Sequence, residues 1–216
     1  FFKTYPILGN DSQFYKFISG TFSSQVDYTT KIDTALNPLI STTLLSGTFG
    51  MSDAVVNNHP LQKKLAGFLN LKEFNRVVLD QWESTVLVKD NILHLKDLTL
   101  TSDDIGFELN GTQNLITDKI DFSVSVLLPA RFKKAIASVI TARAASALSR
   151  DDGTIRVPLR ITGTYGNPNI QPDKEVIEPI VKDFLKRKAG NVLKNLFGGD
   201  DKQQNKADTT AADSTS

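Results

Sequence analysis

Few side chains in this chain of 216 residues are suited to acid–base or metal chemistry, because it has two histidines and no cysteine. His59 stands before a proline at the start of a predicted helix, where a capping or surface role fits. His94 lies between two leucines of a predicted strand, on the face opposite to theirs. Neither has a neighbouring residue that would complete a nucleophile and base pair. Without a thiolate ligand, a zinc site is not expected either.

Two other motifs have the residue types of binding sites but not their spacing. The paired aspartates Asp103-Asp104 and Asp151-Asp152 stand where the chain turns, and paired aspartates at turns are ordinarily solvated turn formers. Gly163 and Gly166 follow a predicted strand but lack the lysine and the spacing of a phosphate-binding loop. We therefore predict no catalytic, cofactor-binding or metal-binding residue and no cofactor, and we expect a protein that is not an enzyme.

Charge and hydropathy give no indication of a nucleic-acid ligand or of a membrane span. The formal net charge is +1, so the molecule has no electrostatic bias toward nucleic acid. The lysines of the predicted last helix have no aromatic stacking platform beside them, so nucleic acid is not an expected partner. No apolar run approaches the ~18 residues that span a bilayer. The lack of cysteine is compatible with an oxidising periplasm and a reducing cytosol alike.

Period-2 alternation of apolar residues predicts most of the fold. Residues 18–32 suit one long strand or two, residues 42–56 predict another strand, and residues 82–128 read as an antiparallel meander of four short strands. Gly20 predicts a local bend or bulge, and the phase change at Lys96-Asp97 predicts a bulge. A final strand is predicted over residues 156–162, followed by a turn and the entry to a helix. Pro158 cannot donate to a ladder, which favours an edge position or a strand start for it.

Helical periodicity predicts three helices, over residues 60–70, 130–149 and 179–197, the last with Pro179 in its first turn. Residues 200–216 contain no large apolar side chain and are predicted to be a disordered tail. The expected fold class is thus α+β, with a curved, groove-like and mainly antiparallel sheet and a few amphipathic helices. The expected domain is residues 1–199.

The apolar face of the predicted sheet is wide enough to need a cover. The ordinary interpretation is a core covered by the three helices, and the alternative is a groove that stays open at one edge. The residues predicted to line such a groove are Val86, Val88, Leu93, Leu95, Phe107, Leu109, Ile120, Phe122, Val124 and Val126. The last helix either packs on the sheet or presents its apolar residues to a membrane surface or a partner, and those residues are Val181, Phe184, Leu185, Val192, Leu196 and Phe197.

The stretch from Val157 to Thr164, closed by Asn167-Pro168 and Pro172-Asp173, closely resembles the end of the AsmA-like C-terminal domain. That family of Gram-negative envelope proteins includes AsmA and TamB. The resemblance extends back to about Leu45 through three further blocks of similar residues, which are Leu45-Ser46-Gly47-Thr48-Phe49, Leu95 to Gly111 and Asp118-Lys119-Ile120-Asp121.

The resemblance implies a non-enzymatic role in outer-membrane biogenesis. Members of the family resemble bridge-like lipid carriers, in which a curved sheet forms a groove whose apolar inner wall holds phospholipid acyl chains. It also implies a periplasmic domain of a longer chain, anchored to the inner membrane by a segment upstream of residue 1. The alternative is a protein-binding assembly factor for outer-membrane protein insertion, with an envelope protein as partner. A carbohydrate-binding β-sandwich is a third, weaker interpretation, because few exposed aromatic residues are predicted.

Overall fold

The computed structural model describes the backbone of residues 17–197, and side chains are described for these residues except 40 and 191–197. The predicted tail of residues 200–216 lies outside the described residues. The chain divides into two compact units, Phe1–Val181 and Lys182–Ser216. The sheet and three of the helices belong to the first unit.

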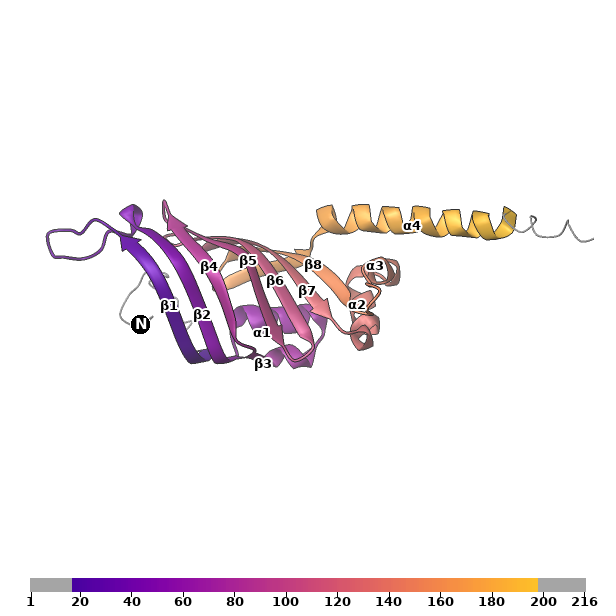
Figure 1. Cartoon of the computed structure of the whole chain (residues 1–216), viewed down its shortest axis with the longest axis horizontal. Coiled ribbons are helices and arrows are strands. Elements are labelled where there is room, and N and C mark those ends of the chain that lie inside the picture. Colours follow the sequence, from indigo (N-terminus) through magenta and orange to yellow (C-terminus); the bar gives the residue numbers. More distant parts are fainter. Residues whose placement is uncertain (1–16, 198–216) are drawn as a thin grey trace, which may run out of the picture. The chain divides into compact units, whose positions relative to one another are not determined.

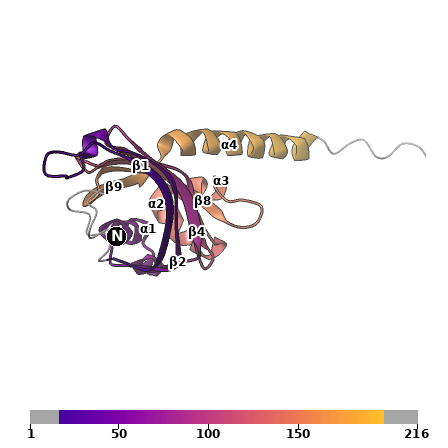
Figure 2. The ribbon, with the colours of Figure 1, turned by 60° about the vertical axis from the view of Figure 1, so that its left-hand side comes forward.

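The α+β class and the antiparallel sheet predicted from the sequence are confirmed. Nine antiparallel strands form one sheet in the order β1-β2-β4-β5-β6-β7-β8-β9, with β3 paired to β2. Its strands are β1 (Ile18–Thr29), β2 (Leu44–Asn57), β3 (Arg76–Leu79), β4 (Trp82–Lys89), β5 (Ile92–Ser102), β6 (Ile105–Asn114), β7 (Lys119–Leu128), β8 (Ile155–Thr164) and β9 (Asn167–Pro172). Figures 1 and 2 show that the sheet is curved and that α1 lies on its concave side.

Polar turns and two irregularities in the ladder set the register. Asp90 and Asn91 both take positive φ, 53° and 63°, as the two-residue hairpin between β4 and β5 requires. The register shifts at Gly20, between Ser19 and Thr21, and again between Leu95 and Leu98, so the predicted bulges are confirmed. At the second bulge, Asp97 has a φ of 51° and its N–H donates to the Asn110 side chain at 2.7 Å.

Four α-helices and three short 3-10 turns accompany the sheet in the described residues. The helix predicted over 60–70 is confirmed as α1. The one predicted over 130–149 is interrupted at Thr141, which has a φ of 91° and whose hydroxyl accepts from the Ala144 N–H at 3.3 Å. The elements are η3 (Ile40–Thr42), α1 (Pro60–Leu69), η4 (Lys72–Asn75), η5 (Ala130–Phe132), α2 (Lys133–Ile140), α3 (Ala142–Ala147) and α4 (Lys174–Phe197).

The prediction for Pro158 was wrong, because β8 is an interior strand between β7 and β9. The Pro158 carbonyl accepts from the Asp173 N–H at 3.0 Å, so its ring nitrogen faces the β9 side as well. The β8–β9 ladder runs from Thr164 back to Leu159, which pairs with Pro172, so Pro158 lies just beyond the last pair. The missing donor therefore falls where the ladder stops, and an interior strand tolerates it.

The segment after β8 also differs from the prediction. A two-residue turn leads into β9, an edge strand that contains the prolines at 168 and 172 and that was not predicted. Helix α4 begins at Lys174 and not at Pro179, and the Asp173 carboxylate accepts from the Val176 N–H at 3.3 Å at its start. Pro179 consequently lies inside the helix.

The main core lies between the helices and the strands β7 and β8. Side chains of α1, α2 and α3 pack there against the inward residues of these two strands. Ile136 of α2 and Val126 of β7 are fully buried. Ile177 of α4 is also buried in this cluster, with Val181 packed at its edge. The helices therefore cover one end of the concave face.

Candidate functional site: the concave wall

Alternation along paired strands identifies the inward side chains of every strand in the sheet. Phe122 of β7 is buried and pairs with Gly111 of β6, which pairs with Leu95 of β5. Leu95 pairs with Val86 of β4, so the same face continues across the sheet. We call the inward residues of β1, β2, β4 and β5 the concave wall; they include Phe22, Val26, Tyr28, Leu45, Phe49, Met51, Trp82, Val86, Val88, Leu93, Leu95, Leu98 and Leu100.

Helices cover the other end of this face. Ile120, Phe122, Val124 and Val126 of β7 are buried at 5% exposure or less in the same cluster as the inward side chains of α1 and α2. These four predicted groove residues thus lie in a helix-covered core. Phe107 and Leu109 of β6 are half-buried at the border of that core, as is Leu95 of β5.

The concave wall itself packs mainly strand against strand. One cluster joins Val88, which is 1% exposed, and Val86 to Leu45 and Leu115, with Leu93 half-buried beside them. A second cluster joins Met51, Ala54 and Leu79 to half-buried neighbours. Neither cluster contains a residue of α1, α2 or α3. Within the described part of the chain, the wall therefore has half-buried apolar side chains that α1, α2 and α3 do not cover.

The opposite face of the sheet is polar. Arg156 pairs with Glu108 at 2.6 Å, and Arg160 pairs with Asp121 at 2.6 Å while donating to Ser123 at 3.0 Å. These are partly exposed pairs that contribute at most about 1 kcal/mol each. Their value here is as markers of the solvated face, which contrasts with the apolar concave wall.

A polar pair of the buried His59 and the half-buried Tyr165 holds the N-terminal end of α1 against the β8–β9 turn. The Leu61 N–H donates to His59 Nδ1 at 3.2 Å, so the neutral imidazole carries its proton on Nε2 and donates to the Tyr165 hydroxyl at 2.7 Å. The His59 N–H donates to the Gln62 side chain at 3.1 Å. The capping role predicted for His59 is thus confirmed, whereas the alternative of a surface role is wrong, because His59 is only 4% exposed.

Burial shapes the ionisation of both partners. It lowers the pKa of the His59 imidazole below its ordinary value of 6.5. It raises the pKa of the Tyr165 phenol above its ordinary value of 10.0. Both groups are therefore held neutral around pH 7.

Lys64 forms a second connection between α1 and β9, because its Nζ donates to Asn167 Oδ1 and to the Pro168 carbonyl, both at 2.7 Å.

No pattern in the sequence predicts this contact between α1 and the β8–β9 turn. His59 and Tyr165 are separated by 106 positions, and no periodic pattern connects two residues so far apart. The curved sheet brings the β8–β9 turn to the N-terminal end of α1, next to the point where β2 leads into that helix.

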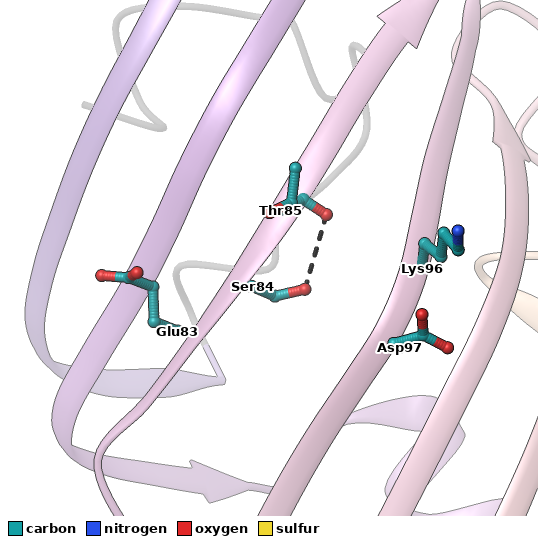
Figure 3. A pocket seen from close by; sticks show the side chains of 5 residues that line it. All are labelled: Glu83, Ser84, Thr85, Lys96 and Asp97. Carbon is teal, nitrogen blue, oxygen red and sulfur yellow. Dashed lines mark hydrogen bonds between the residues drawn. The ribbon is translucent and has the colours of Figure 1, made fainter.

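A hollow of about 450 Å³ opens where β4 and β5 separate (Figure 3). The two strands pair only from Val86 to Lys89 of β4, because the bulge in β5 ends their ladder. The side chains that line the hollow are polar, and they are Glu83, Ser84, Thr85, Lys96 and Asp97. A smaller hollow of about 300 Å³ lies over β5, β6, β7 and β8 and is lined by Ile92, Thr112, Asn114, Lys119, Ile120, Asp121 and Thr162. Neither is lined by a histidine.

The described residues contain no group of three or more His, Asp or Glu side chains placed to hold a metal ion. His94 lies on the solvated face, paired across the ladders with Leu87 and Thr112. No helix within residues 17–197 is both long and apolar enough to cross a membrane.

The apolar residues predicted on the last helix fall into three groups. Val181 packs against the main core. Phe184 is half-buried with Lys188 Nζ 5.9 Å from its ring centroid, whereas Leu185 is 39% exposed. The side chains of the remaining three, Val192, Leu196 and Phe197, lie outside the described ones.

Comparison of the chain with protein-family models, with curated proteins and with solved structures gives no match. The geometry of the concave wall, together with the residues that carry the resemblance, is accordingly the basis for a functional proposal.

Proposed function

We propose that this chain is a non-enzymatic acyl-chain-binding domain that acts in outer-membrane biogenesis, as the carriers of the AsmA-like family do. One observation supports the proposal most: the concave wall presents half-buried apolar side chains that α1, α2 and α3 do not cover, on a sheet whose other face is charged. A phospholipid placed there would shelter its acyl chains on the wall and keep its head group in water. The cargo is phospholipid that passes between the inner and outer membranes.

The energetics suit a carrier that must release its cargo. Full burial of a methylene contributes about 0.8 kcal/mol, so a chain of about 14 methylenes that buries half of its surface gains about 6 kcal/mol. That gain corresponds to a dissociation constant on the order of 0.1 mM for one chain. A second acyl chain on the same lipid would tighten binding without any specific polar contact.

The location of the proposed site follows from burial. Leu93 and Val26 are half-buried in the cluster around Val88 and offer surface to a ligand. Phe122 and Val124 offer almost none, because each is only 5% exposed beneath the helices. We therefore place the acyl chains over β1, β2, β4 and β5. In the cell, we propose, the domain works in the periplasm and is held at the inner membrane by a segment upstream of residue 1.

Lipid capture by a matched pair of variants tests the proposal. Leu93→Asp puts a carboxylate on the concave wall, whereas Leu87→Asp puts one on the solvated face of the adjacent strand, where Leu87 is 37% exposed. The purified protein would be incubated with vesicles of fluorescent phosphatidylethanolamine and phosphatidylglycerol, separated by flotation, and assayed for bound lipid. We expect Leu93→Asp to lose most of the lipid and Leu87→Asp to keep it.

A bulky apolar variant distinguishes loss of binding from loss of the fold. Leu93→Trp keeps the wall apolar but fills space above it, so it should reduce the amount of bound lipid while circular dichroism stays unchanged. If the wild-type protein captures no lipid, or if a folded Leu93→Asp protein captures as much as Leu87→Asp, the proposed function is wrong.

A further inference from the structure

The two edges of the sheet are built differently. Edge strand β9 has six residues, two of which are the prolines Pro168 and Pro172, and Lys64 donates to its first two residues. Prolines, a nearby lysine and a short length are the devices by which proteins block an edge. Edge strand β1 has twelve residues with neither proline nor lysine, and Asp27 is its only charge. Among the described residues, no strand pairs with its outer side.

Strand β1 is also regular over most of its length. Beyond the bulge at Gly20, its register with β2 is unbroken from Thr21 to Thr29. Its inward positions continue the concave wall with Val26 half-buried and Tyr28 40% exposed at the edge. A regular edge that no described strand covers, with apolar residues on one face, is a template for a further strand of the same pattern.

We propose that β1 pairs with β1 of a second copy of this chain, antiparallel and around a two-fold axis at Gln25. In this register Gln25 faces Gln25 of the second copy, Phe22 faces Tyr28, and Asp27 faces Ser23. It pairs the whole unbroken stretch from Thr21 to Thr29 and sets no like charges opposite each other. A two-fold interface requires such self-complementarity.

The same register joins the two concave walls. In this register even-numbered residues face even-numbered residues, and the even-numbered residues of β1 are the inward ones. Inward side chains of one copy therefore meet inward side chains of the other. The paired sheets would form one continuous apolar face. This inference goes beyond the proposed lipid binding and does not depend on it, because pairing is measured on the delipidated protein.

Cysteine crosslinking tests the register, and the chain is suited to it because it has no cysteine of its own. Gln25→Cys places the two thiols directly opposite each other at the centre of the pairing. Thr99→Cys is the matched control, since Thr99 is an exposed polar residue on the interior strand β5. Under mild oxidation we expect a disulfide-linked dimer from Gln25→Cys only. Equal crosslinking of the two variants would overturn the proposal.

A charge exchange at the same position gives an independent test. Gln25→Lys and Gln25→Glu each set like charges opposite each other, and each should lower the association constant about fivefold relative to wild type. Mixing the two variants sets opposite charges together and should restore association to the wild-type level or above. Sedimentation velocity over a concentration series measures all four samples. A wild-type chain that stays monomeric throughout, or a mixture no tighter than its components, would show that β1 does not pair with itself.

Discussion

Protonation of His59 should weaken the fold in a pH window that its contacts define. The imidazole is buried, its Nδ1 accepts from the Leu61 N–H, and its Nε2 proton is donated to the Tyr165 hydroxyl. A second proton on Nδ1 would remove the acceptor that caps α1 and would place a charge in a buried site. The folded state therefore binds a proton on His59 less readily than the unfolded chain does.

The sign and size of the effect follow from linkage. Burial lowers the pKa of His59 from its ordinary value of 6.5, so the unfolded chain takes up the proton first as the pH falls. The stabilising contribution of neutral His59 is complete above about pH 6.5. Below that pH it is lost at up to about 1.4 kcal/mol per pH unit, until the pKa of the folded state is reached.

Urea unfolding at a series of pH values between 4 and 8, on the order of half a unit apart, measures this contribution. His59→Asn keeps a side-chain acceptor at the helix start but does not titrate in this range. We expect the free energy of unfolding of the wild-type protein to fall more steeply below pH 6.5 than that of the variant. Parallel curves would refute the reasoning, because the buried imidazole would then titrate alike in both states.

Tyr165→Phe examines the other partner in the same assay. It removes the hydroxyl that accepts from His59 Nε2 and keeps the half-buried ring, so loss of this hydrogen bond should cost about 1 kcal/mol at pH 7. Because burial raises the pKa of the Tyr165 phenol above 10.0, the wild-type protein should lose stability as the pH rises through that value, and the variant should lose less. An alkaline limb identical in the two proteins would contradict this assignment.

Two further predictions concern the covered end of the sheet. Ile136 is fully buried in α2, so Ile136→Ala should lower the free energy of unfolding by about 2–5 kcal/mol in urea titration. A loss below about 1 kcal/mol would mean that α2 does not form the core. Gly111→Ala should destabilise by more than about 1 kcal/mol, because Gly111 has a φ of 151° and a Cβ there would lie 2.2 Å from the Asp121 carbonyl oxygen. A thermal midpoint equal to that of the wild type would show that β6 and β7 are not packed so closely.

The fold was predictable wherever one local pattern decided it. The alternation from Ile120 to Leu128 placed β7 and its buried face correctly, and the phase change at Lys96-Asp97 marked the bulge in β5. Polar residues at the turns fixed the hairpins, because those positions need left-handed backbone angles that Asp and Asn tolerate. These features depend only on near neighbours in the sequence.

The sequence failed where distant parts of the chain decide the structure. Pro168 and Pro172 argued against a strand, yet β9 forms because an edge tolerates them. Which apolar residues the helices cover could not be predicted either, since burial of Phe122 and partial exposure of Leu93 follow from where α1 and α2 pack. The hydrogen bond between His59 and Tyr165 could not be predicted for the same reason, because the two residues are 106 positions apart.

Site-specific photocrosslinking tests the central claim most directly. A benzophenone amino acid would be introduced in place of Leu93 on the concave wall or of Leu87 on the solvated face, and the full chain would be irradiated with acyl-labelled phospholipid vesicles. We predict that lipid adducts, read by mass spectrometry, form at position 93 and remain near background at position 87. Adducts of equal yield at the two positions, or at position 87 alone, would contradict the claim that the concave wall holds acyl chains.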